Sequence, residues 1–250
     1  MGINYANFTF HQNPLVHKLL TKIAFKKLCH PFQPFILGQK NFAPKFAKKF
    51  DIKLIMYGEN AIELGMDKKN KNNPKMSNKY FSSNKDPKTN VISGVTVLEL
   101  IKKYKLSLND LEPYLPLAEK DFKKSGIEFH TFSYYKKWNF HDNYYYAIEN
   151  TEFKPNPEAL EGSYDKYASM DDKLDWLHFY TFYTKFGMGR TTAATDQEIR
   201  SGAITREEGV KLVKRFDGKF PKKYLNDCLE YMGITLKEFK KTIDNFRPRH

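Results

Sequence analysis

The spacing of hydrophobic and polar residues predicts helices and two strands in the first part of the chain. Apolar residues recur at helical spacing over residues 17–28, and Pro31 disfavours a longer helix. Residues 30–50 are expected to form a loop that leads into a second helix. An apolar run over residues 52–57 predicts a buried strand, and the alternating run over residues 126–132 predicts another strand.

Short helices and polar stretches are expected between and after these strands. Residues 67–90 are polar and nearly free of aliphatic side chains, which indicates an exposed loop, with a lid as the functional alternative. Residues 95–104 and 108–114 are expected to be short helices, the second with a capping start at Ser107. Residues 134–146 form the densest aromatic block of the chain. Such blocks commonly build a core or a helix junction, and a wall that stacks against a sugar remains the alternative.

The last hundred residues have a mainly helical pattern. Residues 171–186 predict a long helix with an acidic cap, and Thr205 begins a capping box that leads a further helix. Two closing helices are expected over residues 221–232 and 236–246, and Thr235 resembles another cap. The pattern contains no internal repeat and no coiled-coil heptads.

The composition is that of a folded protein with one large domain, or with a core and an appendage. Hydrophobic residues make up 40% of the 250 residues and aromatic residues 16%, which supplies apolar area to offset the entropy lost on folding. One domain with a helical extension is expected.

The formal net charge of +13 does not by itself indicate a nucleic-acid partner. Only six of the 42 basic residues are arginines, and the lysines are scattered along the chain. A basic surface attracts phosphates by releasing counterions, but no nucleic-acid-binding motif accompanies the charge. We therefore expect a solvated basic surface that attracts anionic substrates weakly, and no nucleic-acid partner.

Cysteine usage and hydropathy predict a cytoplasmic protein. Cys29 and Cys228 lie far apart in the sequence and neither belongs to a CxxC motif, so neither a disulfide framework nor a zinc site is indicated. The first residues lack the basic start and apolar run of a signal peptide, and no apolar run is long enough to span a bilayer. We expect no membrane association.

Three of the six arginines are concentrated in the glycine-punctuated segment 187–209. The charged residues of interest in this segment are Arg190, Asp196, Glu198, Arg200 and Arg206. In a chain that prefers lysine, these arginines indicate a need for the planar guanidinium group, which binds phosphate or carboxylate with two parallel hydrogen bonds. A network of arginines and carboxylates that clamps a helix junction explains the same residues, and the sequence leaves both interpretations open.

Polar residues also follow and precede the predicted strand over residues 52–57. In open α/β sheets ligands bind beyond the carboxyl ends of the strands, where Gly58, Glu59 and Asn60 lie. The last two side chains could hold magnesium, a nucleotide ribose or a substrate amide, while a helix cap at Asn60 is the structural alternative. The loop before the strand contributes His30, Gln33, Gln39 and Lys40, for which ordinary surface polarity is the alternative.

Several common catalytic motifs are missing from the sequence. There is no GxSxG, HExxH, Walker or GxGxxG motif. The sequence therefore gives no support for a serine hydrolase, a zinc metalloprotease or a Rossmann dehydrogenase.

Four segments resemble the N-acetyl sugar amidotransferases of lipopolysaccharide and of pseudaminic or legionaminic acid biosynthesis. They are HPFQPFILGQKNFAPKFA, LIMYGEN, EGSYDKYASMDDKLD and KFGMGRTTAATDQEIRSGAITREEGVKLV. The likeness runs in one order from about Phe8 to the C-terminus and is greatest for the pseudaminic acid branch. The IRSG-ITREE stretch is its most specific part.

The resemblance implies an α/β fold. A partial PP-loop parallel sheet, of the adenine nucleotide alpha hydrolase type, is expected over residues 1–150 with the polar loop inserted at 67–90, and a mainly helical C-terminal region over residues 151–250. It also implies that ATP and Mg²⁺ activate the acetamido carbonyl of an N-acetyl sugar or nonulosonic acid, and that ammonia then attacks to give an acetamidino group. ATP is needed because an amide oxygen leaves poorly until it carries phosphate or AMP. A glutaminase of the histidine-biosynthesis type, with its cyclase-like companion, is the implied source of ammonia.

One expected part of this family is not found in the sequence. The SGGKDS-type loop, whose backbone N–H groups cradle pyrophosphate, would precede the region aligned with Met1, as would a cysteine-rich segment. We therefore expect the chain to need a separate ATP-binding half. A noncatalytic subunit that binds a sugar, or that scaffolds such a half, is the alternative.

The resemblance assigns roles to regions of the chain rather than to single atoms. The predicted catalytic residues are Glu59, Asn60, Arg190 and Glu198. The predicted substrate- or nucleotide-binding residues are His30, Gln33, Gln39, Lys40, Gly58, Thr191, Asp196, Arg200 and Arg206, and no metal ligand is assigned. We expect the strand that ends at Tyr57 and the arginine-bearing segment after Gly189 to meet in one cleft.

Overall fold

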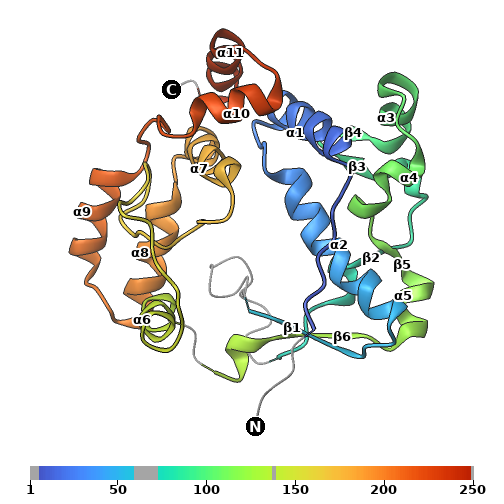
Figure 1. Cartoon of the computed structure of the whole chain (residues 1–250), viewed down its shortest axis with the longest axis horizontal. Helices are drawn as coiled ribbons and strands as arrows, with labels where there is room; N and C mark the ends of the chain where they lie inside the picture. Colours follow the sequence, from blue (N-terminus) through green and yellow to red (C-terminus); the bar gives the residue numbers. More distant parts are fainter. Residues whose placement is uncertain (1–5, 59–72, 137–138, 249–250) are drawn as a thin grey trace.

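The computed structural model describes residues 6–58, 73–136 and 139–248, which form an α/β structure made mostly of helices. Figure 1 shows two halves that are joined at the top of the view. The blue to green segments up to residue 131 form the right half, and the yellow to orange segments from residue 140 to residue 216 form the left half. The last two helices, drawn in red, lie at the top. The predicted α/β class is confirmed at this level.

Two long helices begin the described chain. α1 (Pro14–Leu28) starts where the Asn13 side chain accepts hydrogen bonds from backbone N–H groups of the first turn. α2 (Gln33–Lys49) takes up most of the segment in which we expected a loop, so the loop is confined to the few residues between the two helices. The first turn of α2 tolerates Pro34 because no hydrogen bond is needed from that nitrogen.

The described part of the right half contains three pairs of short strands. The parallel pairs are β1 (Leu54–Tyr57) with β6 (Glu128–Thr131) and β2 (Ser82–Ser83) with β5 (Leu117–Ala118), and the antiparallel pair is β3 (Val91–Ile92) with β4 (Val95–Thr96). The two predicted strands are thus present as β1 and β6. The prediction that the first is buried is wrong, because Leu54 is 52% exposed and Met56 is 42% exposed. Only the face with Ile55 and Tyr57 packs against the core.

Short helices fill the space between these strands. They are η1 (Asn78–Tyr80), η2 (Pro87–Thr89), α3 (Val97–Tyr104), α4 (Leu108–Leu111), η3 (Glu112–Tyr114), α5 (Glu119–Ser125) and η4 (Phe132–Tyr134). The expectation of an exposed loop over residues 67–90 is wrong at Phe81. This ring is fully buried and stacks on Phe129, with the ring centroids 3.6 Å apart. Residues 67–72 lie outside the described residues.

The left half and the top of the molecule are helical. They contain α6 (Phe140–Asn150), α7 (Lys173–Phe186), α8 (Arg190–Ser201), α9 (Arg206–Phe216), α10 (Leu225–Met232) and α11 (Leu236–Phe246). The predicted caps are confirmed. The Asp172 side chain caps α7, and Thr205 and Thr235 form reciprocal capping boxes with the glutamates three residues later at the starts of α9 and α11.

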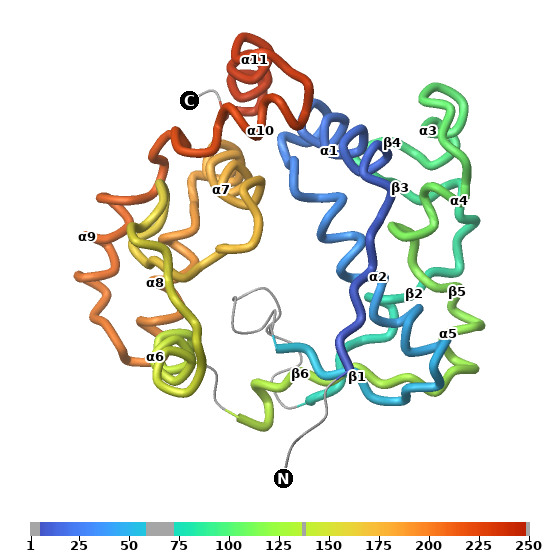
Figure 2. The backbone as a smooth tube through the Cα atoms, in the orientation of Figure 1, coloured from blue at the N-terminus to red at the C-terminus, as the bar shows by residue number. Residues whose placement is uncertain are grey.

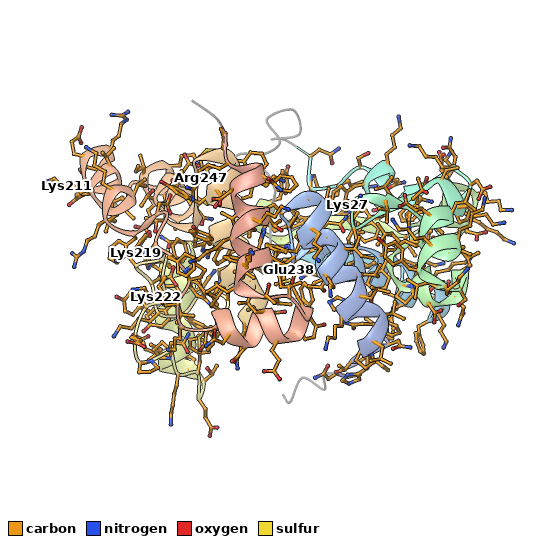
Figure 3. The ribbon with its side chains drawn as sticks, turned by 90° about the horizontal axis from the view of Figure 1, so that it is seen from above. Lys27, Lys211, Lys219, Lys222, Glu238 and Arg247 are labelled. Atoms are coloured by element: carbon orange, nitrogen blue, oxygen red, sulfur yellow. The ribbon has the colours of Figure 1, made fainter. Side chains whose placement is uncertain are left out.

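α1 joins the two halves because it packs into two different cores. One part of the helix packs against α3 and the β3–β4 pair. Phe25, further along, packs among residues of α7, α10 and α11, and its ring stacks on Phe239 with centroids 5.4 Å apart. Lys26 and Glu238 form an ion pair at 2.9 Å, and Figure 3 shows Glu238 where α11 meets α1. The division into domains at residue 150 stays a prediction, and this contact crosses it.

The described residues of the aromatic block, 134–136 and 139–146, do not form a core. No residue of α6 is buried, and Tyr145 and Tyr146 are mostly exposed. Tyr144 stacks on Tyr167, with ring centroids 4.0 Å apart. Figure 2 shows α6 beside α8 in the left half.

Basic side chains lie on the outer surface. Figure 3 shows Lys211, Lys219 and Lys222 along the outer side of the left half, and all three are exposed. This arrangement agrees with the expected solvated basic surface. Among the helices that the structure describes, none combines the length and the apolar character needed to cross a membrane.

Candidate functional site

The carboxyl end of β1 is directed from the right half towards the left half. β1 and β6 are parallel, and Figures 1 and 2 show both strands running towards the centre of the view. Gly58 follows β1 and is exposed. Glu59 and Asn60 lie outside the described residues. The cleft that we expect between this strand end and the arginine-bearing segment therefore stays a prediction.

Arg190, the first residue of α8, is a half-buried cation with no hydrogen bond and no ion pair to any described residue. Its Nε atom is completely buried. Its guanidinium carbon lies 5.4 Å from the centre of the Phe179 ring on α7. Arginine keeps its charge at any physiological pH, and a partly buried charge without a partner is unfavourable. A side chain in this state is suited to bind an anionic group.

Asp175 on α7 lies near enough to Arg190 for the guanidinium charge to affect it. Burial raises the pKa of Asp175 to about 6, and a hydrogen bond from Ser169 and the charge of Arg190 oppose part of this increase. The Ser169 carbonyl in turn accepts a hydrogen bond from Trp176 Nε1 at 3.0 Å. Asp175 is thus a fixed carboxyl group that titrates close to neutral pH beside an unpaired arginine.

His30 and His178 connect the corner between α1 and α2 to α7. Their rings stack with centroids 4.2 Å apart and planes 14° apart. Burial lowers the pKa of His30 to about 4 and that of His178 to about 3, and the charge of Lys185 acts in the same direction. The Nδ1 atom of each ring is buried and has no hydrogen-bond partner among the described residues. Both imidazoles are therefore neutral at pH 7.

Residues from three separate parts of the sequence meet along α7. His30 precedes α2, Asp175 and His178 belong to α7, and Arg190 begins α8. The sequence indicated His30 and Arg190 as site residues, but not the two residues of α7 that bring them together. The only signal for them was that polar side chains interrupt the apolar pattern of this helix.

Glu198 is buried on the inner face of α8 and ties α6 to it. The His141 Nε2 atom donates a hydrogen bond to Glu198 Oε1 at 2.6 Å, and the Tyr164 hydroxyl donates to the same oxygen. The Nδ1 atom on the other side of the His141 ring forms a hydrogen bond with the Tyr167 hydroxyl. Burial, followed by the interaction with Glu198, raises the pKa of Tyr164. This predicted catalytic carboxylate thus has internal partners.

The N-terminus of α8 is capped by a residue at the end of α9. The Asp217 carboxylate accepts hydrogen bonds from the backbone nitrogens of Gly189 and Thr191, both at 2.9 Å. A Cβ atom at Gly189 would lie 2.5 Å from Asp217 Oδ1, which explains the glycine. The Thr191 hydroxyl donates to the Gly162 carbonyl at 2.9 Å. Thr191, a predicted binding residue, therefore holds the start of α8 and so positions Arg190.

The other charged residues of the segment 187–209 do not join this group. Asp196 and Arg200 form an ion pair at 3.1 Å on the exposed side of α8. Arg206 is exposed at the first position of α9. Among the described residues the ion pair of Asp196 and Arg200 does not extend to Arg190, which is the arginine of the segment in a partly buried environment.

The remaining predicted site residues lie on α2. Gln33 accepts a hydrogen bond from the Ser93 backbone nitrogen at 3.0 Å, and the Lys40 ammonium lies 3.8 Å from the centre of the Tyr80 ring. Gln39 is exposed. The contacts of Gln33 and Lys40 give both residues a structural role that the sequence did not reveal.

The described residues contain no group of three or more His, Cys, Asp or Glu side chains that could hold a metal ion. Cys29 and Cys228 are both free and buried. We therefore assign no magnesium ligand within the described part of the chain.

Comparison with known proteins gives one family match. Residues 161–250 match the family model of the C-terminal domain of WbpG-like lipopolysaccharide biosynthesis proteins. The matched part contains α7 to α11 and thus Asp175, His178, Arg190 and Glu198. No curated protein matches the chain significantly. The family match supports a role in lipopolysaccharide sugar biosynthesis.

Proposed function

We propose that this chain is the sugar-binding part of an ATP-dependent amidotransferase that converts the acetamido group of an N-acetyl sugar or nonulosonic acid into an acetamidino group. The observation that carries the proposal is Arg190, a half-buried arginine without a partner among the described residues, inside the segment that matches the lipopolysaccharide biosynthesis domain. A sugar acid or a phosphorylated sugar supplies the anion that this guanidinium lacks.

The reaction needs an activated amide oxygen and a nitrogen nucleophile. The amide oxygen attacks the α-phosphorus of ATP, which releases pyrophosphate and gives an O-adenylated imidate. Ammonia then adds to the imidate carbon and AMP leaves with the original oxygen, so that C=O becomes C=NH. In this scheme ATP binds to a PP-loop part outside the described residues, and a partner glutaminase supplies the ammonia. We derive no step through Mg²⁺, because the described residues offer no cluster of ligands.

The residues of this chain bind and orient the substrate in the proposed reaction. Arg190 holds the anionic group, and Asp217 and Thr191 fix the backbone that carries it. Asp175, with a pKa of about 6, can accept a proton from the attacking nitrogen. The residues after β1 are expected to face the acetamido group. The free, buried cysteines are compatible with a cytoplasmic location, which belongs to the same proposal.

The test is an amidotransfer assay with the full chain and a co-expressed PP-loop subunit. The mixture contains ATP, Mg²⁺, ¹⁵N-labelled ammonium and an N-acetylated nonulosonic acid, and mass spectrometry follows the replacement of the amide oxygen by labelled NH. We expect labelled product and AMP in equal amounts. Arg190→Ala should lower kcat/KM at least about 10-fold, which corresponds to losing a hydrogen bond to a charged group.

The matched control is Arg215→Ala, because Arg215 is an exposed arginine of α9. This variant should keep the wild-type rate. If the sugar binds but no labelled product forms in the complete mixture, the enzymatic proposal is wrong and the chain acts as a noncatalytic sugar-binding or scaffold subunit.

A further inference from the structure

A continuous set of aromatic rings lies beside Arg190. We call it the α7 aromatic surface, and it consists of Phe32, Phe35, His178, Phe179, Phe182 and Phe186. Neighbouring rings in this set have centroids 4.6 to 6.1 Å apart. None of these side chains is fully buried, and Phe186 is 54% exposed.

The α7 aromatic surface joins the two halves of the molecule. Phe32 and Phe35 belong to the corner and first turn of α2, and the other rings belong to α7. Phe32 and His178, whose ring centroids are 5.9 Å apart, form the contact between the start of α2 and α7. Figure 1 shows α7 at the inner edge of the left half, which faces α2. A ligand on this surface would therefore touch both halves.

One end of the surface carries the cation Arg190, and a second cation, Lys185, lies with its ammonium 5.1 Å from the centre of the Phe186 ring. Arg190 lies over the Phe179 ring and has no hydrogen bond or ion pair among the described residues. Ligand sites commonly combine apolar and aromatic walls with a few fixed polar groups that orient the ligand. Here the walls suit the apolar face of a ring, and the guanidinium suits an anion attached to that ring.

We propose that the α7 aromatic surface binds an anionic monosaccharide, with the sugar ring against the phenylalanines and its carboxylate or phosphate on Arg190. The choice of a sugar rests on the proposed function, whereas the need for an anion comes from Arg190. Lys185, whose ammonium donates a hydrogen bond to the Leu28 carbonyl, lies near the Phe186 end of the surface, whereas Arg190 lies at Phe179. Asp175 lies near enough to Arg190 to interact with it electrostatically, so an anion bound at Arg190 must avoid the Asp175 carboxyl group.

Isothermal titration of the full chain without ATP or ammonia tests this proposal. The probes are N-acetylneuraminic acid, N-acetylglucosamine 1-phosphate and the neutral N-acetylglucosamine. We expect at least one anionic probe to bind about 10-fold or more tightly than the neutral one, as for a hydrogen bond to a charged group. The tighter of the two anionic probes identifies carboxylate or phosphate as the natural group. Equal affinity for all three probes, or no binding of either anionic sugar at millimolar concentration, overturns the proposal.

Single substitutions distinguish the contribution of the cation, Arg190, to the affinity from that of the aromatic rings. Arg190→Ala should weaken the anionic probe at least about 10-fold and leave the neutral one unchanged, while Arg190→Lys should retain part of the affinity because it keeps the charge without the planar fork. Phe182→Ala should weaken anionic and neutral probes by the same factor. Arg215→Ala is the control and should change neither.

The outcome is independent of catalysis. An unchanged melting temperature shows that each variant is folded. If the protein binds the anionic sugars more tightly than the neutral one, and Arg190→Ala abolishes this difference, the proposal is supported even if no amidotransfer occurs. Amidotransfer by a protein whose sugar affinity does not change in Arg190→Ala would overturn this proposal and leave the proposed function in place.

Discussion

His30 and His178 stack face to face between the corner of α1 and α2 and the middle of α7, with their ring centroids 4.2 Å apart. Lys185, about two turns after His178 on α7, donates a hydrogen bond to the Leu28 carbonyl at 2.7 Å, which keeps its ammonium group close to both rings. Protonation of either imidazole would place a second cation in this buried position. The contact between the two halves is therefore built for neutral histidines.

We predict that the protein loses stability in mild acid because of this pair. The folded pKa values, about 4 and about 3, lie below the ordinary value of 6.5, so the unfolded chain binds protons first as the pH falls. The free energy of unfolding should decrease from about pH 6.5 towards pH 4, by no more than about 2 kcal/mol per histidine at pH 5. Urea denaturation at pH 7.5 and at pH 5 measures this change.

Two variants show whether the pair is responsible. His178→Phe keeps a stacking ring without a titrating nitrogen, so the difference in stability between pH 7.5 and pH 5 should become smaller. His11→Ala removes an exposed histidine and should leave the difference unchanged. The explanation is wrong if both variants show the same pH dependence as the wild type.

We also predict that Asp217 is important for the position of Arg190. Asp217→Ala removes the carboxylate that caps α8 and should lower the free energy of unfolding by about 1–2 kcal/mol. The control is Asp196→Ala, which breaks an exposed ion pair on the same helix and should cost less than about 0.5 kcal/mol. Chemical denaturation distinguishes the two. Equal losses would show that the cap contributes nothing beyond a surface charge.

Glu198 should matter for the attachment of α6. Glu198→Ala leaves the donors of His141 and Tyr164 without their acceptor, and we expect a loss of about 1–3 kcal/mol. Hydrogen exchange should become faster for amides of residues 140–150 and stay unchanged in α10. Glu198→Gln keeps a carbonyl acceptor and should show a smaller effect. Uniform acceleration across the chain would argue against a local role.

Local signals predicted α7, α9, α10 and α11, but not α6 and α8. The Thr-x-x-Glu boxes at Thr205 and Thr235 are complete within four residues, so the starts of α9 and α11 could be read directly from the sequence. Burial could not. Phe81 stands in a polar stretch and is buried because Phe129, distant in the sequence, stacks on it. The exposed face of β1 likewise depends on which side the core covers.

The candidate site was only partly visible in the sequence. Arg190 was noticeable because this chain uses few arginines, and it is the arginine of its segment that the structure places in a partly buried position without a partner. The role of His178 could not be predicted, since it comes from stacking on His30, far away in the sequence. Asp175 has its contacts nearby, with Ser169 and Arg190, and the sequence reasoning missed it. The proposed ATP-binding part and the roles of Glu59 and Asn60 stay predictions.

The most direct test of this account is a crystal structure of the full chain with bound N-acetylneuraminic acid. We predict that the sugar carboxylate lies within hydrogen-bonding distance of the Arg190 guanidinium and that the ring lies against Phe182. A sugar bound on another face of the molecule, with Arg190 still making no contact to it, would contradict the account.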